Sequence, residues 1–210
     1  MTEQHGYMPV ETFELVGGRL CLDFTNTVGC YFLPERSEKI TSYEHLLVFT
    51  RRVAMLGADE EQALAKEAAR RPAEAERIVG EAHRLRDALF ALFYPDRPGR
   101  DEALAIVNRY VVRARARQLL VSAEGAFGFA FRADDEGDVD LERPLWPIAL
   151  SAAELLTSPG LGRVRACSND SRCTWLFVDE SKNHSRRWCS MRDCGNRVKA
   201  KRHYEKKRAG

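Results

Sequence analysis

The sequence predicts an α+β fold, in which a mainly helical N-terminal domain with small β-hairpins precedes a small cysteine-rich unit. Apolar residues recur at three- and four-residue spacing through most of the first 160 residues, which is typical of helices that bury one face. Short runs with alternating apolar residues, separated by turns that contain glycine, interrupt these helices. Four of the six cysteines fall within 28 residues near the C-terminus, which indicates a separate unit with its own chemistry.

Length and composition agree with this division. The chain has 210 residues and a hydrophobic fraction of 44%, enough for one packed domain and a small appendage. No run of eighteen apolar residues is present, and the first ten residues lack the basic start and apolar stretch of a secretory signal. We therefore expect a cytoplasmic protein without a membrane partner.

The first elements are predicted to be two short strands. Residues 13–16 and 20–24 are apolar runs on either side of Gly17 and Gly18. Two glycines between such runs favour a hairpin turn.

Four helices are predicted after Pro34. Ser42 is suited to cap the first helix and Gly57 to end it, while Pro72 is suited to begin the third. The third helix has the clearest apolar stripe, and Pro95 ends it. The four run from Ser42 to Gly57, from Asp59 to Arg71, from Pro72 to Phe93 and from Asp101 onward.

A hairpin and a fifth helix complete the N-terminal domain. Residues 118–121 and 126–132 are predicted strands, and the alternating phenylalanines of the second are typical of a half-buried strand. An acidic loop at 134–140 and a helix at 146–156 follow. Residues 158–162 resemble a linker, so we divide the chain into residues 1–160 and 161–210.

The charge is distributed unevenly between these two parts. The net charge of the chain is +2, but residues 161–210 hold 14 Lys and Arg against 5 Asp and Glu. An acidic body with a basic C-terminal part indicates two regions with different partners, of which the basic one favours a polyanion.

The clustered cysteines have the spacing of metal ligands. They form two pairs, C-x5-C and C-x4-C, separated by fifteen residues. Paired thiolates in a reducing compartment are typical of a tetrahedral Zn²⁺ site, and four thiolates leave no open position for activating water. Residues 174–178 are a predicted strand, 179–183 a turn and 185–188 a returning strand. The predicted ligands are Cys167, Cys173, Cys189 and Cys194, whereas Cys21 and Cys30 lie among apolar residues and are read as structural.

A strongly basic helix is predicted directly after Cys194. It has cations on two stripes and little apolar surface, so an external polyanion is a better partner for it than the protein core. A solvated basic tail is the alternative. The predicted nucleic-acid contacts are Arg186, Arg187, Asn196, Arg197, Lys199, Lys201 and Arg202.

Two motifs carry a resemblance to known families. Residues 188–197, Trp-Cys-Ser-Met-Arg-Asp-Cys-Gly-Asn-Arg, resemble the CGNR zinc finger, and residues 22–27, Leu-Asp-Phe-Thr-Asn-Thr, resemble the start of the ABATE domain that precedes such a finger. The resemblance implies a bacterial, stress-related transcription regulator whose finger binds DNA, with the four clustered cysteines as zinc ligands. By the order of its elements the finger is expected to resemble a treble clef, with Gly195 allowing a tight turn at the start of the last helix.

The role of the N-terminal domain stays open between sensing a small-molecule effector and forming a homodimer. Asp23 and Asn26 are the candidate ligand-binding residues, although turns and helix caps use these side chains often. The sequence contains no nucleophile elbow, phosphate loop or dinucleotide fingerprint, so we do not expect an enzyme. An RNA-binding factor, a zinc-stabilised protein adaptor and a thiol redox switch are the alternatives to a DNA-binding regulator.

Overall fold

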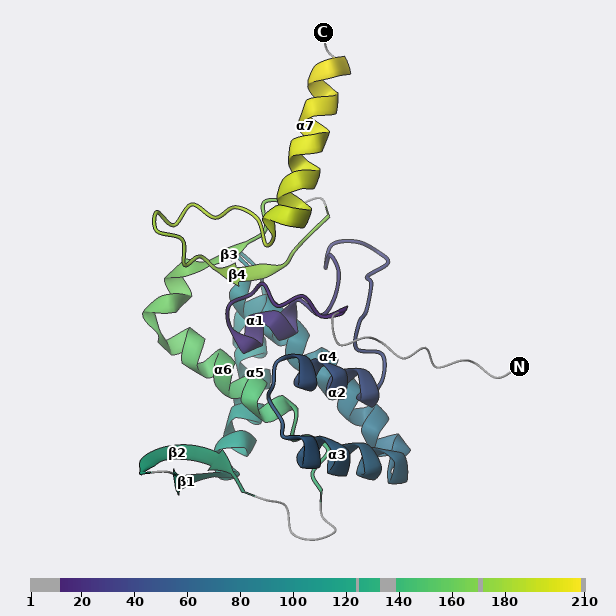
Figure 1. Ribbon diagram of the computed structural model, residues 1–210, viewed down its shortest axis with the longest axis vertical. Helices are drawn as coiled ribbons and strands as arrows, with labels where there is room; N and C mark the ends of the chain where they lie inside the picture. The colour runs from purple at the N-terminus through teal and green to yellow at the C-terminus, as the bar shows by residue number, and fades with distance from the viewer. Residues whose placement is uncertain (1–11, 124, 133–138, 170–171, 209–210) are drawn as a thin grey trace, which may run out of the picture.

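The computed structural model describes residues 12–123, 125–132, 139–169 and 172–208. A helical body occupies the middle of the molecule, with a two-stranded hairpin at one end of its long axis and a projecting C-terminal helix at the other (Figure 1). The predicted acidic loop falls largely outside the described residues. The helices are α1 (Leu20–Thr25), α2 (Tyr43–Arg52), α3 (Ala58–Arg70), α4 (Pro72–Phe93), α5 (Arg100–Ala116), α6 (Leu145–Thr157) and α7 (Asn196–Arg208), and the strands are β1 (Gln118–Ala123), β2 (Ala126–Phe131), β3 (Val164–Ala166) and β4 (Leu176–Val178).

The first predicted hairpin is wrong, because residues 20–25 form helix α1. Cys21, Leu22 and Phe24 are all fully buried, so α1 lies in the core with apolar contacts on most sides. A six-residue helix buried in this way is too short and has too little polar surface for a helical stripe to reveal it. Its alternating apolar residues imitate a strand.

Helices α2 to α5 follow the predicted order. The Ser42 hydroxyl accepts a hydrogen bond from the amide of His45 and caps α2, as predicted. Gly57 does not end this helix: α2 ends at Arg52, and Gly57 is the N-cap residue of α3. Pro72 begins α4, whose 22 residues bury one long face. None of the described helices is long and apolar enough to cross a membrane.

A buried ion pair joins α4 to the loop before α2. The Arg86 side chain is 4% exposed and donates to the carboxylate of Glu38, with 2.7 Å between Nη1 and Oε1. The same nitrogen donates to Thr27 Oγ1 at 3.1 Å. Burial opposes the ionised form of Glu38, but the hydrogen bond and charge of Arg86 prevail and lower its pKa.

Strands β1 and β2 form the second predicted hairpin, with an unbroken antiparallel register from Gln118 opposite Phe131 to Ala123 opposite Ala126. The expectation of a half-buried second strand is wrong for its outer part. Phe127 and Phe129 are 79% and 68% exposed, and only the inner end of the strand at Phe131 packs against the body, on Trp146.

The segment predicted as a linker is part of the folded body. Residues 159–163 form a 3-10 helix, η2, which leads from α6 directly into β3. Strand β3 pairs with β4, and Leu176 and Val178 of β4 belong to the same apolar core as α1 and α4. The C-terminal cysteine-rich part therefore packs on the helical body through its own strand.

Candidate metal centre and basic helix

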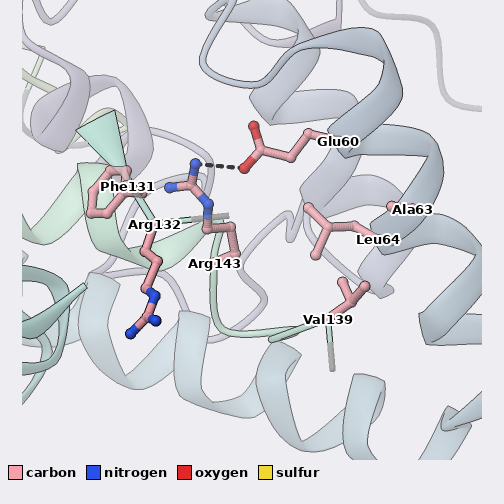
Figure 2. Close-up of a pocket in the computed structure, with 7 residues that line it drawn as sticks. All are labelled: Glu60, Ala63, Leu64, Phe131, Arg132, Val139 and Arg143. Atoms are coloured by element: carbon pink, nitrogen blue, oxygen red, sulfur yellow. Dashed lines mark ion pairs between the residues drawn. The ribbon is translucent and has the colours of Figure 1, made fainter. Parts of the chain in front are cut away.

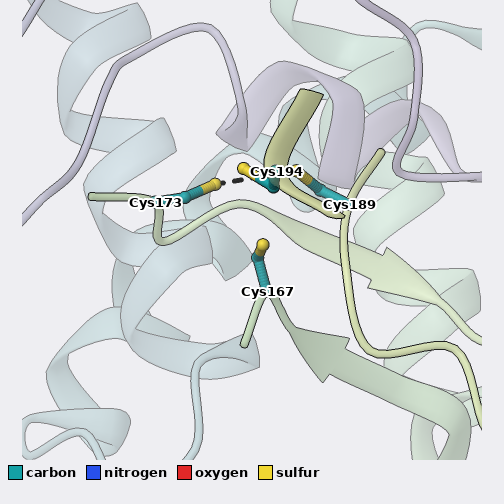
Figure 3. A group of neighbouring side chains, drawn as sticks. All are labelled: Cys167, Cys173, Cys189 and Cys194. Carbon is teal, nitrogen blue, oxygen red and sulfur yellow. Dashed lines mark hydrogen bonds between the residues drawn. The ribbon is translucent and has the colours of Figure 1, made fainter. Parts of the chain in front are cut away.

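Four cysteine side chains converge at the base of α7. Cys167 follows β3, Cys173 precedes β4, Cys189 lies in a later loop, and Cys194 lies in a π-helical turn, η3 (Met191–Gly195), that leads into α7 (Figure 3). All four are buried. Their sulfur atoms all lie within 4.8 Å of one another.

The arrangement of the sulfur atoms fits a tetrahedral Zn²⁺ ion. Zinc–sulfur bonds of about 2.3 Å place the sulfurs of a tetrahedron about 3.8 Å apart. The Cys173 and Cys189 sulfurs are 3.6 Å apart, close to this value and far longer than a disulfide bond. All four thiols are free. The donor set is therefore that of a closed, four-thiolate site.

The electrostatics of the cluster also favour a cation at its centre. Hydrogen bonds from Cys173 and Cys189 lower the pKa of the Cys167 thiol, and the same contact with Cys167 raises the pKa of Cys173. Without a cation, one thiolate therefore opposes ionisation of its neighbours. A bound divalent metal ion compensates this repulsion and lets all four sulfurs carry charge.

Backbone contacts hold the ligand loops in place. The Cys167 amide donates to the carbonyl of Trp175 at 2.9 Å, and the Cys173 amide donates to that of Asn169 at 2.8 Å. The Asn169 side chain donates to the sulfur of Cys194 at 3.5 Å. Such contacts orient metal-binding sulfurs and stabilise their negative charge. We call residues 167–169 and 172–173 the knuckle loop.

The predicted return strand at 185–188 is absent, because β4 pairs with β3 instead. After β4 the Asp179 carboxylate organises a loop: it accepts hydrogen bonds from the amides of Ser181 and Arg186, both at 3.0 Å. The hydrogen bonds from Ser181 lower the pKa of Asp179. A side chain that binds these amides substitutes for a strand partner.

Gly195 lies beside the Met191 side chain and has an ordinary backbone conformation. A Cβ atom at this position would lie 2.6 Å from the Met191 sulfur and 3.5 Å from the Trp188 ring. The residue has no positive φ, and the flexible, 45% exposed Met191 side chain can move aside, so neither backbone conformation nor packing requires glycine here. Cys194 thus lies in the turn just before α7.

Helix α7 presents its cations to solvent. Side chains of Arg197 and Lys201 are 66% and 72% exposed, and Lys199 is also exposed. Arg197 pairs with Asp193 at 2.8 Å, one helical turn back, and the Asn196 amide group donates to the Arg192 carbonyl. The helix leaves the body and points away from it (Figure 1).

A groove of about 420 Å³ separates α7 from the knuckle loop. Three cations, from Arg172, Arg197 and Lys201, line it together with the exposed ring of Tyr204. The remaining lining residues are Asn169, Val198 and Ala200. Arginine and lysine beside an aromatic ring make a surface suited to phosphate and base.

Comparison with protein families decides the identity of both parts. A model of the CGNR zinc finger matches residues 163–207. The ABATE model, described as "Putative stress-induced transcription regulator", matches residues 18–159, more than half of the chain. The chain belongs to the ABATE family. A comparison with curated proteins finds no match.

In this ABATE protein the four cysteines are the zinc site of the CGNR finger. The resemblance suggested by residues 22–27 and 188–197 is thereby confirmed. The structure places the remaining predicted residues in two groups. One group is exposed on or near α7, and the other is engaged within the fold.

Arg186 belongs to the second group. Its guanidinium donates to the carbonyls of Val16, Trp188 and Cys189 at 3.0, 3.1 and 2.6 Å, and it lies 4.1 Å over the Phe177 ring. These contacts give Arg186 a structural role, and its nucleic-acid contact stays a prediction. Arg187 is exposed, and the side chain of Arg202 lies outside the described residues.

Asp23 and Asn26 also serve the fold of the ABATE domain. Asp23 accepts a hydrogen bond from the Gly17 amide at 2.7 Å. Asn26 is 2% exposed, and its amide group both donates to and accepts from the backbone of Leu176 at 2.9 and 2.8 Å. Asn26 thus attaches strand β4 to α1, and Asp23 also lines a shallow pocket with Arg19 and Arg52. A ligand at either residue stays a prediction.

The ABATE domain also contains a pocket of about 340 Å³ beside α3 (Figure 2). Arg143 and the exposed Arg132 both line it, and Arg143 pairs with Glu60 at 2.6 Å and lies 4.2 Å over the Phe131 ring. We assign no ligand to the pocket.

Sequence reasoning missed two residues of the site. Arg172 lines the groove and Asn169 contacts a ligand sulfur. The position of Arg172 between the first two cysteines of a basic unit is a signal that could have identified it. Asn169 gives no such signal, because its partner Cys194 is 25 residues away.

Proposed function

We propose that this protein is a transcription regulator that binds duplex DNA through α7 and the adjoining knuckle loop. The observation that supports this proposal is a cationic helix that leaves the protein body at the zinc site and has no apolar face to bury. Helix α7 holds seven Lys and Arg against one acidic residue, Glu205. A helix of this composition gains little from the core, so a polyanion is the partner that stabilises it.

The dimensions of α7 suit a DNA groove. Thirteen residues extend about 20 Å, and a major groove admits a helix of this kind. Phosphates on either side then lie within reach of the exposed lysines and arginines, while the groove beside Arg172 offers a second set of cations. Phosphate contacts of this type position a protein on the duplex and provide most of its salt-dependent affinity.

The zinc site sets the direction of α7. Cys194 joins the ion to the turn before the helix, and Cys167 and Cys173 join it to the strands that pack on the body. A structural zinc therefore fixes the helix relative to the knuckle loop. The proposal places the protein in the cytoplasm, where thiolates stay reduced.

Salt dependence of DNA binding tests the phosphate contacts. We expect the affinity of the zinc-loaded protein for duplex DNA, measured by fluorescence anisotropy, to fall steeply between low and physiological salt. Lys201→Ala should weaken binding similarly on unrelated sequences and reduce the slope of log K against log salt by about 0.9, the value for one phosphate.

Lys66→Ala is the matched control, because Lys66 is an exposed lysine on α3, away from α7. It should leave the slope unchanged. A loss on one DNA sequence alone would assign Lys201 to a base edge instead. If the slope of log K against log salt were the same for the wild type and Lys201→Ala, the result would contradict a DNA contact through α7.

Competition between nucleic acids separates DNA from RNA. Duplex DNA should displace a labelled duplex at lower concentration than a structured RNA of equal length, because an exposed rod-like helix fits the DNA major groove and not the narrow one of A-form RNA. Stronger competition by RNA would replace the proposal with an RNA-binding role. No binding to either would favour an acidic protein partner.

A further inference from the structure

We propose that the β1–β2 hairpin is the surface through which two copies of this chain associate as a twofold-symmetric dimer. The hairpin is the part of the described fold with the most unburied apolar surface for its size. Its exposed large side chains are Leu119, Leu120, Val121, Phe127 and Phe129, with exposed fractions from 38% to 79%.

The strand register collects the bulkiest of these side chains on one face. Leu120 is directly opposite Phe129, and Phe127 is opposite Ser122, so these residues share a face with Phe131. At the inner end of this face Phe131 packs on the buried ring of Trp146 and under Arg143 (Figure 2). The outer face therefore continues the core of the body into solvent, where nothing in the described chain covers it.

The hairpin also lacks the features that keep exposed strand edges from pairing with another chain. Residues 118–131 contain no lysine, arginine or proline, and their one charged residue is Glu124. The six paired positions are free of bulges. Proteins that keep an edge strand unpaired usually place charges, prolines or bulges along it. A two-stranded sheet is also marginal by itself and is stabilised by further strands or by a covered face.

The exposed area suits a weak dimer. The two phenylalanines leave on the order of 300 Å² of apolar surface, and Leu120, which shares their face, adds roughly 100 Å². Two copies together then bury about 800 Å², which is the range of weak, transient interfaces. Such an area favours a dimer in the micromolar range rather than an obligate one.

A second copy fits this surface better than an unrelated partner. The outer part of the face is mostly apolar and has no charged residue, so it offers no charge pattern to select a different protein. An antiparallel hairpin is self-complementary about a twofold axis, which lets the same phenylalanines meet each other. The hairpin lies at the end of the molecule opposite α7 (Figure 1), so this contact leaves both basic helices free.

Sedimentation velocity on the full-length, zinc-loaded protein tests the proposal without any nucleic acid. The wild type should shift from monomer to dimer between about 1 and 100 µM. The double variant Phe127→Ser, Phe129→Ser should stay monomeric to at least a tenfold higher concentration. Its melting temperature at low concentration should be unchanged, because both rings are largely exposed in the monomer.

Val112→Ser is the matched control, since Val112 is 67% exposed on α5 and lies outside the hairpin. It should dimerise as the wild type does. A wild type that stays monomeric at 100 µM, or a double variant that dimerises normally, would overturn the proposal. DNA binding is absent from this experiment, so its result is independent of the function proposed for α7.

Discussion

Asp23 shows how a single residue couples the fold to pH. Its carboxylate is largely buried beside the Gly17 amide, and this burial raises its pKa to about 6. Hydrogen bonds from Gly17 and Val16 and the charges of Arg52 and Arg186 oppose the shift without cancelling it. The folded protein therefore holds the proton of Asp23 more tightly than the unfolded chain, whose carboxyl has a pKa of about 4.

The sign of this shift gives a pH prediction. The contribution of protonated Asp23 to the free energy of unfolding is fully present below about pH 4. It is lost as the pH rises through about 6. Two pKa units correspond to an upper limit of about 3 kcal/mol. Asp23→Asn keeps an acceptor for the Gly17 amide but cannot ionise. The melting temperature of the variant minus that of the wild type should therefore increase by a few degrees between pH 4 and pH 7.5, as measured by circular dichroism. A difference that does not change with pH would contradict the raised pKa of Asp23.

Some residue roles could be predicted from the sequence, and others could not. The four zinc ligands could be predicted because their pairing and their charged surroundings are local features. The roles of Asn26 and Arg186 could not, because Asn26 contacts Leu176 and Arg186 contacts Val16, at separations of 150 and 170 residues. A polar side chain whose partner lies that far along the chain gives no periodic signal.

Among the elements, α4 is stabilised by an ion pair that its apolar stripe does not reveal. Arg86 lies on the buried face of the helix and depends on Glu38 for compensation of its charge. Removing one partner of such a pair leaves a buried charge without compensation, which is more costly than removing both.

Glu38→Gln should therefore lower the free energy of unfolding by about 3 kcal/mol at pH 7. The loss should shrink as the pH falls through the lowered pKa of Glu38, because the wild type then loses the same charge. Glu205→Gln is a control on an exposed pair with Lys201 and should cost less than about 1 kcal/mol. Urea unfolding of both variants measures the difference, and equal losses would refute the special role of Arg86.

Elements with a one-sided apolar stripe could be predicted, whereas a helix buried on most sides and the exposure of a hairpin could not. The long α4 has both a stripe and Pro72 at its start. Helix α1 is buried on most sides, so its sequence imitates a strand. The β1–β2 hairpin was predicted with nearly its observed bounds, but its exposure was not, because alternation does not show what covers a face.

In the whole molecule the zinc finger and the helical body share one core. Leu176 and Val178 of β4 pack with the residues of α1 and α4, and the Tyr31 amide and Trp175 indole add hydrogen bonds across the junction at 3.0 and 2.9 Å. Loss of the metal is therefore expected to destabilise the helical body as well as the finger.

Cys189→Ser tests this coupling. The variant should lose its zinc and lower the melting temperature of the main unfolding transition by at least about 5 °C, because β4 loses the loops that hold it. Cys30→Ser alters a buried thiol outside the cluster and should keep its zinc. Zinc content by metal analysis and calorimetry measure both effects. An unchanged main transition in zinc-free Cys189→Ser would show that the two parts unfold independently.

We propose that zinc orders a basic helix which binds DNA phosphates. The most direct measurement is the affinity of the full-length protein for duplex DNA by fluorescence anisotropy, before and after a strong zinc chelator and again after zinc is restored. We expect chelation to weaken binding by at least about tenfold and restored zinc to recover it, with the steepest salt dependence in the zinc-loaded state. Binding that is absent with zinc, or equally strong without it, would contradict the claim.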